Sequence, residues 1–151
     1  GLFVDERALA NLAEHDPRQR LGDHNLADFL LTVEGVSHFV YLVWSERRER
    51  RVSALELELQ AEVDKYVTCV LVGPPDGLHE RLFERFALEP DLSADERDRY
   101  LAANSNARAY AASLDDRFVS RGRIAEMLHE LRRFYRLGIG EKLDHIGRLA
   151  A

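Results

Sequence analysis

The apolar and polar positions of the chain repeat mainly with the spacing of amphipathic helices. Between residues 25 and 49, one set of residues recurs at alternating intervals of four and three, which places it on one helix face: Leu26, Leu30, Val33, Ser37, Val40 and Trp44. From Ser53 onward the same spacing continues through Leu55, Leu59, Val63, Tyr66 and Val70. The pattern predicts a long helical hairpin over about 25–49 and 53–72.

Two short runs inside this hairpin also have the composition of β-strands. Residues 39–44 and 67–72 are rich in β-branched and aromatic side chains. As strands they would form a pair without a good third partner, and a stable sheet usually needs three strands or more. We therefore interpret both runs as helix interiors, with an α+β fold containing a small sheet as the alternative.

Capping and breaking residues set the remaining helix boundaries. Asp5 and Asn25 are candidate N-caps, and Ser53 and Ser93 are each followed three residues later by glutamate, which is the pattern of a capping box. Further helices are expected at about 5–15, 76–86, 93–114, 120–136 and 141–149, separated by proline, glycine or the Asp115-Asp116 pair. The predicted fold is all-α, an antiparallel helix bundle that forms a single domain over 1–151.

The charge, the length of the apolar runs and the cysteine content of the chain argue against several classes of function. The chain has 21 basic and 27 acidic residues, a net charge of −6, which argues against general binding to nucleic acid. No run approaches the roughly 18 uninterrupted apolar residues of a membrane span, so no membrane association is expected. The single cysteine, Cys69, permits no internal disulfide and suits a reducing, cytoplasmic compartment. Because Cys69 lies in an apolar run, we expect a buried, unreactive thiol.

Several ionisable residues fall within the apolar arcs of the hairpin. Glu34 and His38, four residues apart on the first helix, are neighbours on its apolar side. On the second helix, Glu62 lies near the middle of the apolar arc and Glu58 at its edge. Burial of such groups is unfavourable unless they find partners, so their position needs a reason.

Two interpretations of these residues remain open. The first hypothesis is a metal site formed by Glu34, His38, Glu58 and Glu62. Carboxylate and imidazole groups suit iron, manganese or zinc, and di-iron proteins carry such ligands inside helix bundles. The spacing of four departs from the Glu-x-x-His pattern of di-iron proteins. The one Glu-x-x-His motif, at 126–129, lies on the polar side of its helix and is expected at the surface. The other hypothesis is a buried hydrogen-bonded network.

The helix that begins near Ser93 suggests a second candidate site. One of its faces combines small alanines with Tyr100, Asn104 and Tyr110. Small residues permit close packing against a neighbouring helix, or they leave space for a ligand. With Tyr66 of the hairpin, the candidate ligand pocket comprises Tyr66, Tyr100, Asn104 and Tyr110.

Basic residues gather in two places. The run at 47–51 is expected to be a solvated helix end, where cations complement the helix dipole. Arginines also accumulate between 121 and 136, but the preceding helix is too long for a helix-turn-helix, so DNA binding is not expected.

Catalytic motifs are absent from the sequence. It contains no phosphate-binding loop, no Gly-x-Ser-x-Gly, no His-Glu-x-x-His and no Cys-x-x-Cys. The helix at 25–49 is apolar over most of its circumference, and such a helix is either central or covered by a partner. We therefore expect a non-enzymatic interaction or regulatory domain that forms a homodimer through Phe39, Leu42 and Val43. A metal- or small-ligand-binding bundle is the alternative.

Overall fold

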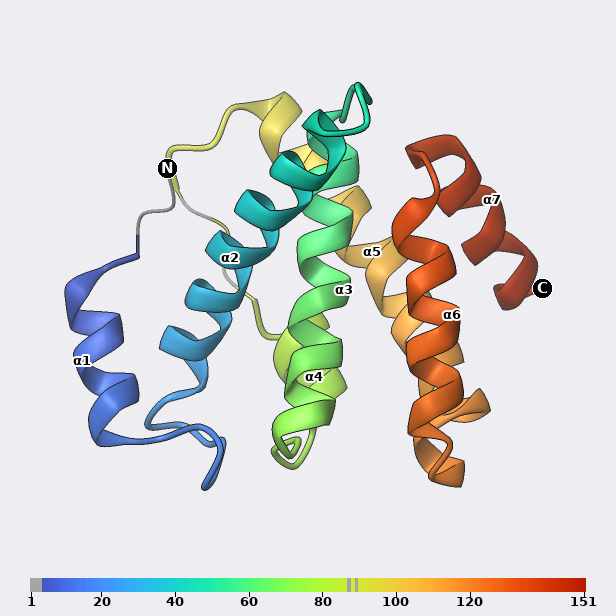
Figure 1. Ribbon diagram of the computed structural model, residues 1–151. Coiled ribbons are helices and arrows are strands. Elements are labelled where there is room, and N and C mark those ends of the chain that lie inside the picture. Colours follow the sequence, from blue (N-terminus) through green and yellow to red (C-terminus); the bar gives the residue numbers. More distant parts are fainter. Residues whose placement is uncertain (1–3, 87, 89) are drawn as a thin grey trace.

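The computed structural model describes residues 4–86, 88 and 90–151, and within them it contains helices and no strand (Figure 1). The helices are α1 (Glu6–Glu14), α2 (Leu26–Glu46), α3 (Ala54–Val72), α4 (Leu78–Phe83), α5 (Ala94–Arg117), the short 3-10 helix η1 (Val119–Arg121), α6 (Ile124–Arg136) and α7 (Ile139–Ala150). The all-α prediction is confirmed. The runs 39–44 and 67–72 lie inside α2 and α3, so the alternative with a small sheet is not supported.

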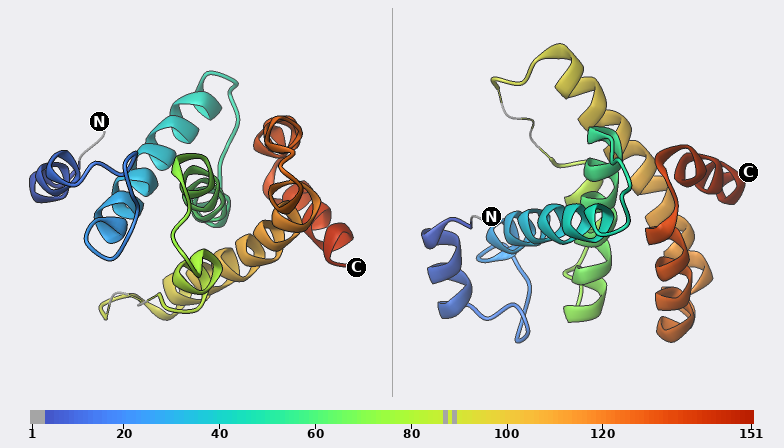
Figure 2. Two further views of the ribbon diagram at one scale, coloured as in Figure 1. Left: turned by 90° about the horizontal axis from the view of Figure 1, so that it is seen from below. Right: turned by 45° about the horizontal axis from the view of Figure 1, so that its top comes forward.

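Helix α3 is the centre of the bundle (Figures 1 and 2). It packs against α2 and α5, while α1 packs against α2, and α4 contacts both α3 and α5. The C-terminal helix α7 packs against α5, and α6 stands beside them. The hairpin expected from the sequence is thus the pair α2 and α3, which are joined by a short loop.

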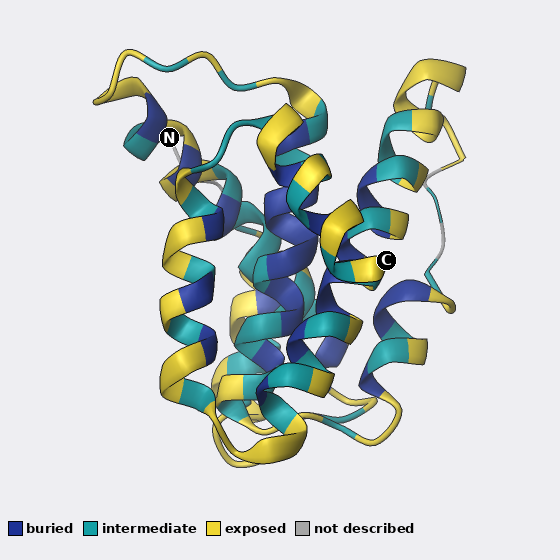
Figure 3. Ribbon diagram, turned by 90° about the vertical axis from the view of Figure 1, so that its right-hand side faces the viewer, coloured by how far each residue is buried: buried dark blue, intermediate teal, exposed yellow. Residues whose placement is uncertain are grey.

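The core lies between α3, α4, α5 and α6. Buried positions follow one side of most helices and exposed positions the other (Figure 3). On α5, Ala103, Ala107 and Ala111 are buried at intervals of four, and these small side chains allow α3 and α5 to pack closely. Helix α3 is buried over most of its circumference and carries four polar or charged residues inside the protein: Glu56, Gln60, Glu62 and Lys65.

Three of the four expected N-caps form. Asp5 accepts a hydrogen bond from the Arg7 backbone, Ser53 accepts one from the Glu56 backbone, and Ser93 forms a complete capping box with Glu96. Asn25 occupies the expected N-cap position of α2, but its side chain makes no capping hydrogen bond. Its side chain instead holds the preceding loop, accepting from the Gly22 N–H and donating to two loop carbonyls, those of His15 and Arg20.

Some predicted boundaries are wrong for identifiable reasons. Helix α2 ends at Glu46 rather than near 49. Helix α5 continues through Asp115 and Asp116 to Arg117, and the buried side chain of Phe118 anchors its end. Helix α7 begins at Ile139, because Gly138 is its N-cap and donates its N–H to the Glu141 carboxylate at 3.0 Å.

The thiol of Cys69 has no solvent exposure, which agrees with the sequence-based expectation. Burial raises its pKa to about 12 from the ordinary 9.0. At a given pH the thiolate fraction is then about a thousandfold smaller than for a free cysteine. We expect Ellman's reagent to leave the native protein unmodified and to react fully in concentrated guanidinium chloride. Rapid reaction of the native protein would contradict this burial.

Candidate functional site

The structure brings together the four residues of the predicted metal site. Glu34 and His38 of α2 face Glu58 and Glu62 of α3. The His38 Nε2 atom lies 3.8 Å from Glu58 Oε2. Burial raises the pKa of Glu58, and the neighbouring carboxylates of Glu34 and Glu62 raise it further, against the opposing effect of His38. These four residues, which share the apolar arcs of their helices, therefore lie close together in space.

A lysine that the sequence analysis did not consider lies at the centre of this group. Lys65 Nζ is 3.0 Å from Glu34 Oε2 and 2.5 Å from Glu62 Oε1, and the residue is 6% exposed. Burial alone would lower the pKa of Lys65, but the two carboxylates outweigh it and the pKa is raised. We call this set the Lys65 cluster: Glu34, His38, Glu58, Glu62, Lys65 and the adjacent Tyr100, whose pKa burial raises to about 12.

The geometry favours an ionic network at this position. The ammonium group of Lys65 neutralises two of the carboxylates directly. Among the described residues, no group of three or more His, Cys, Asp or Glu side chains is arranged to hold a metal ion. The metal site at Glu34, His38, Glu58 and Glu62 stays a prediction, which elemental analysis of untagged protein for iron, manganese and zinc would test.

The residues of the predicted ligand pocket lie in different surroundings. Tyr100 lines a cavity of about 420 Å³ together with Lys65. Tyr66 is buried with its ring 5.2 Å from that of His79, and the Asn104 amide lies 3.4 Å from the Leu82 carbonyl. Tyr110 is also buried, in the packing between α5 and α6. A pocket shared by these residues stays a prediction.

A second polar network joins the ends of three helices. Arg50, in the loop after α2, forms an ion pair with the buried Glu56 at the start of α3 and donates to the Leu137 carbonyl between α6 and α7 at 2.9 Å. Tyr41 donates to Glu56 at 2.5 Å. Two sequence-based interpretations are therefore wrong. Arg50 is not part of a solvated helix end, and the Glu56 side chain binds Arg50 and Tyr41 instead of completing the Ser53 capping box.

Lys142 of α7 extends this network into the core. It is completely buried, and its Nζ lies 2.8 Å from both Gln60 Oε1 and the Phe134 carbonyl. Burial lowers its pKa to about 7. Lys65 and Lys142 are the only two lysines of the chain, and both are buried. Their pKa values shift in opposite directions because Lys65 contacts carboxylates and Lys142 contacts neutral oxygens.

A third buried group lies between α5, α6 and α7. His145 Nε2 is 2.5 Å from Glu130 Oε1, and Tyr110 donates to the same oxygen at 3.3 Å. The Tyr110 ring stacks on Phe134 with centroids 4.1 Å apart. The Glu-x-x-His motif at 126–129 is exposed at both ends, as expected. The buried glutamate of α6 is Glu130, one position after that motif.

The outer side of α2 is apolar and largely uncovered. Five large apolar side chains on it are 39–55% exposed: Leu31, Val36, Phe39, Val40 and Leu42. An apolar groove of about 320 Å³ borders this face, between α2, Thr68 of α3 and Tyr135 of α6. By length and composition α2 is also able to cross a membrane, and 17% of its most apolar window is buried. We refer to these five residues as the α2 face.

Comparison with protein-family models, with curated proteins and with solved structures finds no significant match for this chain.

Proposed function

We propose that this chain is a non-enzymatic interaction domain that self-associates through the α2 face. The observation that carries the proposal is the exposure of five large apolar side chains on one helix. Contiguous apolar surface of this kind is uncommon on monomers and is typical of interaction surfaces. Covering it would contribute about 25 cal/mol for each Å² of apolar surface removed from water.

The shape of the α2 face suits a second helix. Leu31, Gly35 and Phe39 follow one another at intervals of four on the outward side. Gly35 has no side chain, so it leaves a shallow position between two large neighbours. Val36 and Val40 form a parallel row beside them, and together the rows offer ridges and grooves for helix packing.

Charge at the two ends of α2 favours a second copy of this chain as the partner. Asp28 lies in the first turn of α2, and Arg47 and Arg48 directly follow Glu46, the last residue of the helix. Two copies of α2 packed antiparallel about a twofold axis bring Arg47 and Arg48 of each copy toward Asp28 of the other. A parallel arrangement would instead bring like charges together.

Analytical ultracentrifugation of matched variants tests this proposal. Phe39→Asp introduces a charge at the centre of the α2 face, and we expect it to weaken dimerisation by about thirtyfold or more, the effect of losing an interface residue worth about 2 kcal/mol. Leu71→Asp is the control, because Leu71 has similar exposure, 51%, but belongs to α3. That variant should dimerise like the unmodified chain.

Three outcomes would overturn the proposal. One is a monomer at millimolar concentration, and another is equal weakening by Phe39→Asp and Leu71→Asp. The third is a monomer that floats with phosphatidylcholine vesicles and loses this binding in Phe39→Asp, since the α2 face would then contact lipid.

Weaker dimerisation at high salt is expected from the antiparallel arrangement, because salt screens the charges at the helix ends.

A further inference from the structure

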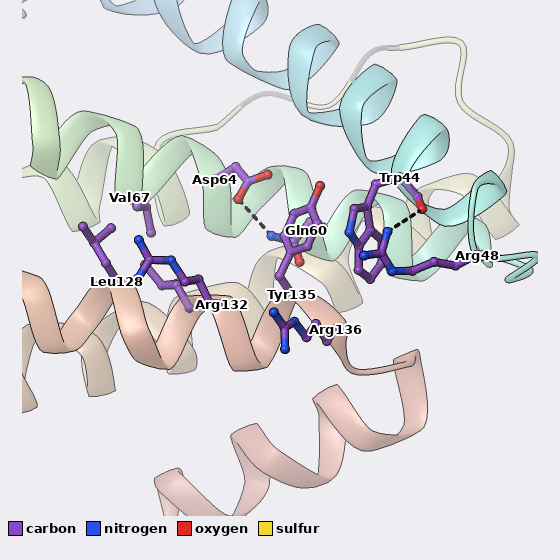
Figure 4. Close-up of a pocket in the computed structure, with 10 residues that line it drawn as sticks. Trp44, Arg48, Gln60, Asp64, Val67, Leu128, Arg132, Tyr135 and Arg136 are labelled. Atoms are coloured by element: carbon purple, nitrogen blue, oxygen red, sulfur yellow. Dashed lines mark hydrogen bonds between the residues drawn. The ribbon is translucent and has the colours of Figure 1, made fainter.

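A further cavity, separate from the α2 face, lies where the end of α2 meets α3 and α6 (Figure 4). Its volume is about 360 Å³, which is within the range of small-molecule sites. Aromatic rings form one end of it, where Trp44 and Tyr135 pack with centroids 5.0 Å apart. Val67, Leu128 and Leu131 supply apolar surface.

Three arginines surround this cavity: Arg48, Arg132 and Arg136. Within the described part of the chain, none of them has a carboxylate at ion-pair distance, whereas Arg123 and Arg133 of the same region pair with Glu126 and Glu130. In a protein with a net charge of −6, three unpaired guanidinium groups around one cavity are a local excess of positive charge.

The positions of these arginines favour an anion between them. Arg132 and Arg136 are four residues apart on α6, and like charges at this spacing repel each other. Arg48 approaches from the end of α2, with its guanidinium 4.4 Å from the centroid of the Trp44 ring. An anion in the cavity would relieve the repulsion and accept paired hydrogen bonds from the planar guanidinium groups.

The polar wall of the cavity is fixed by hydrogen bonds. Gln60 donates to Asp64 at 2.9 Å and accepts from the buried Lys142 at 2.8 Å. Ser37 donates to the other oxygen of Asp64 at 2.6 Å. The one carboxylate of the lining is thus held by neutral donors, and the lining carries three cationic groups against this single carboxylate.

We propose that this cavity binds a small amphipathic anion, with its carboxylate or phosphate group between Arg132 and Arg136 and its apolar part on Val67, Leu128 and Leu131. The lining favours this class of ligand because it contains both apolar side chains and guanidinium groups. An inorganic anion would leave the apolar wall uncovered, and a neutral apolar molecule would leave the guanidinium groups without a partner. The proposed position of the anion, between Arg132 and Arg136, does not involve the α2 face, and Arg48 is the one arginine of the lining that also belongs to the charged end of α2. The cavity shares Asp64 and Tyr135 with the apolar groove, but its arginines lie outside the α2 face.

The single tryptophan of the chain provides a direct measurement. Trp44 lines the cavity, so its fluorescence is sensitive to binding at this position. Hexyl phosphate and hexanoate, which do not absorb with tryptophan, are the two test ligands and distinguish the phosphate from the carboxylate. Hexanol and inorganic phosphate represent the apolar part and the anion alone. We expect saturable changes with at least one organic anion, and binding at least tenfold tighter than with hexanol or inorganic phosphate.

Arginine variants of α6 locate the site. Arg132→Gln and Arg136→Gln should each weaken binding at least tenfold, while Arg133→Gln, on the same helix but outside the cavity lining, should bind like the unmodified chain. These arginines are exposed, so circular dichroism should show unchanged helicity. The proposal is overturned if neither organic anion gives a saturable change, if hexanol binds equally well, or if Arg133→Gln weakens binding as much as the other two.

Discussion

Replacement of Lys65 by methionine is expected to lower the free energy of unfolding by about 3–5 kcal/mol, because removing one partner of a buried ion pair leaves the other charge without compensation. In this protein two carboxylates lose their counterion at once. The Glu62 side chain is only 2% exposed and has little access to water. Methionine keeps most of the length and volume of lysine, so loss of charge dominates the effect.

Urea denaturation at pH 7 measures this difference, and Arg85→Met is the matched control. Arg85 pairs with Glu80 at 2.6 Å, but both side chains are about half exposed or more. Such surface pairs contribute about 0–1 kcal/mol. The double variant Lys65→Met with Glu62→Gln should recover part of the lost stability, because it removes the uncompensated charge. An equal effect of Lys65→Met and Arg85→Met would show that the Lys65 cluster is not a buried ionic network.

Between pH 7 and pH 9, the protein is expected to become more stable by about 2 kcal/mol because of Lys142. The pKa of this lysine is about 7 in the folded protein and has the ordinary value of 10.5 in the unfolded chain. In this window the unfolded chain binds more protons than the folded protein, about half a proton more at pH 7 and nearly one more at pH 9, so a rise in pH favours folding. The window ends near pH 9, where ionisation of Cys69 in the unfolded chain begins to oppose the effect.

Urea denaturation of the unmodified chain and of the Lys142→Met variant between pH 7 and pH 9 tests this prediction, because the variant should show no such rise in the free energy of unfolding. NMR offers a direct reading, because the chain has only two lysines. With selectively labelled lysine, the side-chain signals of Lys142 should titrate near pH 7, while those of Lys65 should stay unchanged through pH 10, since its pKa is raised. A Lys142 signal that titrates above pH 9 would rule out this mechanism.

Hydrophobic spacing was sufficient to predict the helices. The alternation of four and three identified α2 and α3 even where composition favoured strands, because a helical face extends over many residues and a strand-like run is short. The errors fell at helix ends. Burial of Phe118 extends α5 beyond two aspartates, and such tertiary contacts have no local sequence signal.

The glutamate and histidine positions of the Lys65 cluster could be predicted, but its lysine could not. Carboxylates within an apolar arc stand out on a helix wheel. A lysine near such an arc is uninformative, because its long stem usually lies on apolar surface while its charge reaches water. The sequence likewise gave no indication that Lys142 would end beside Gln60, 82 residues earlier in the chain. The arginine-lined cavity combines residues of α2, α3 and α6, so only the packed structure could reveal it.

The contacts of Arg50 and Lys142 also bear on the order in which the chain folds. Helix α3 meets α2 across a short loop, and it meets α5 across the segment that carries α4. Arg50 instead contacts Leu137 at the α6–α7 junction, 87 residues later in the chain. Lys142 of α7 contacts Gln60 of α3, 82 residues earlier. Because closing a longer loop loses more chain entropy, these bonds belong to the late stages of folding. The C-terminal helices would then dock onto a hairpin that is already formed, and the two side chains would mainly limit how fast the finished bundle reopens.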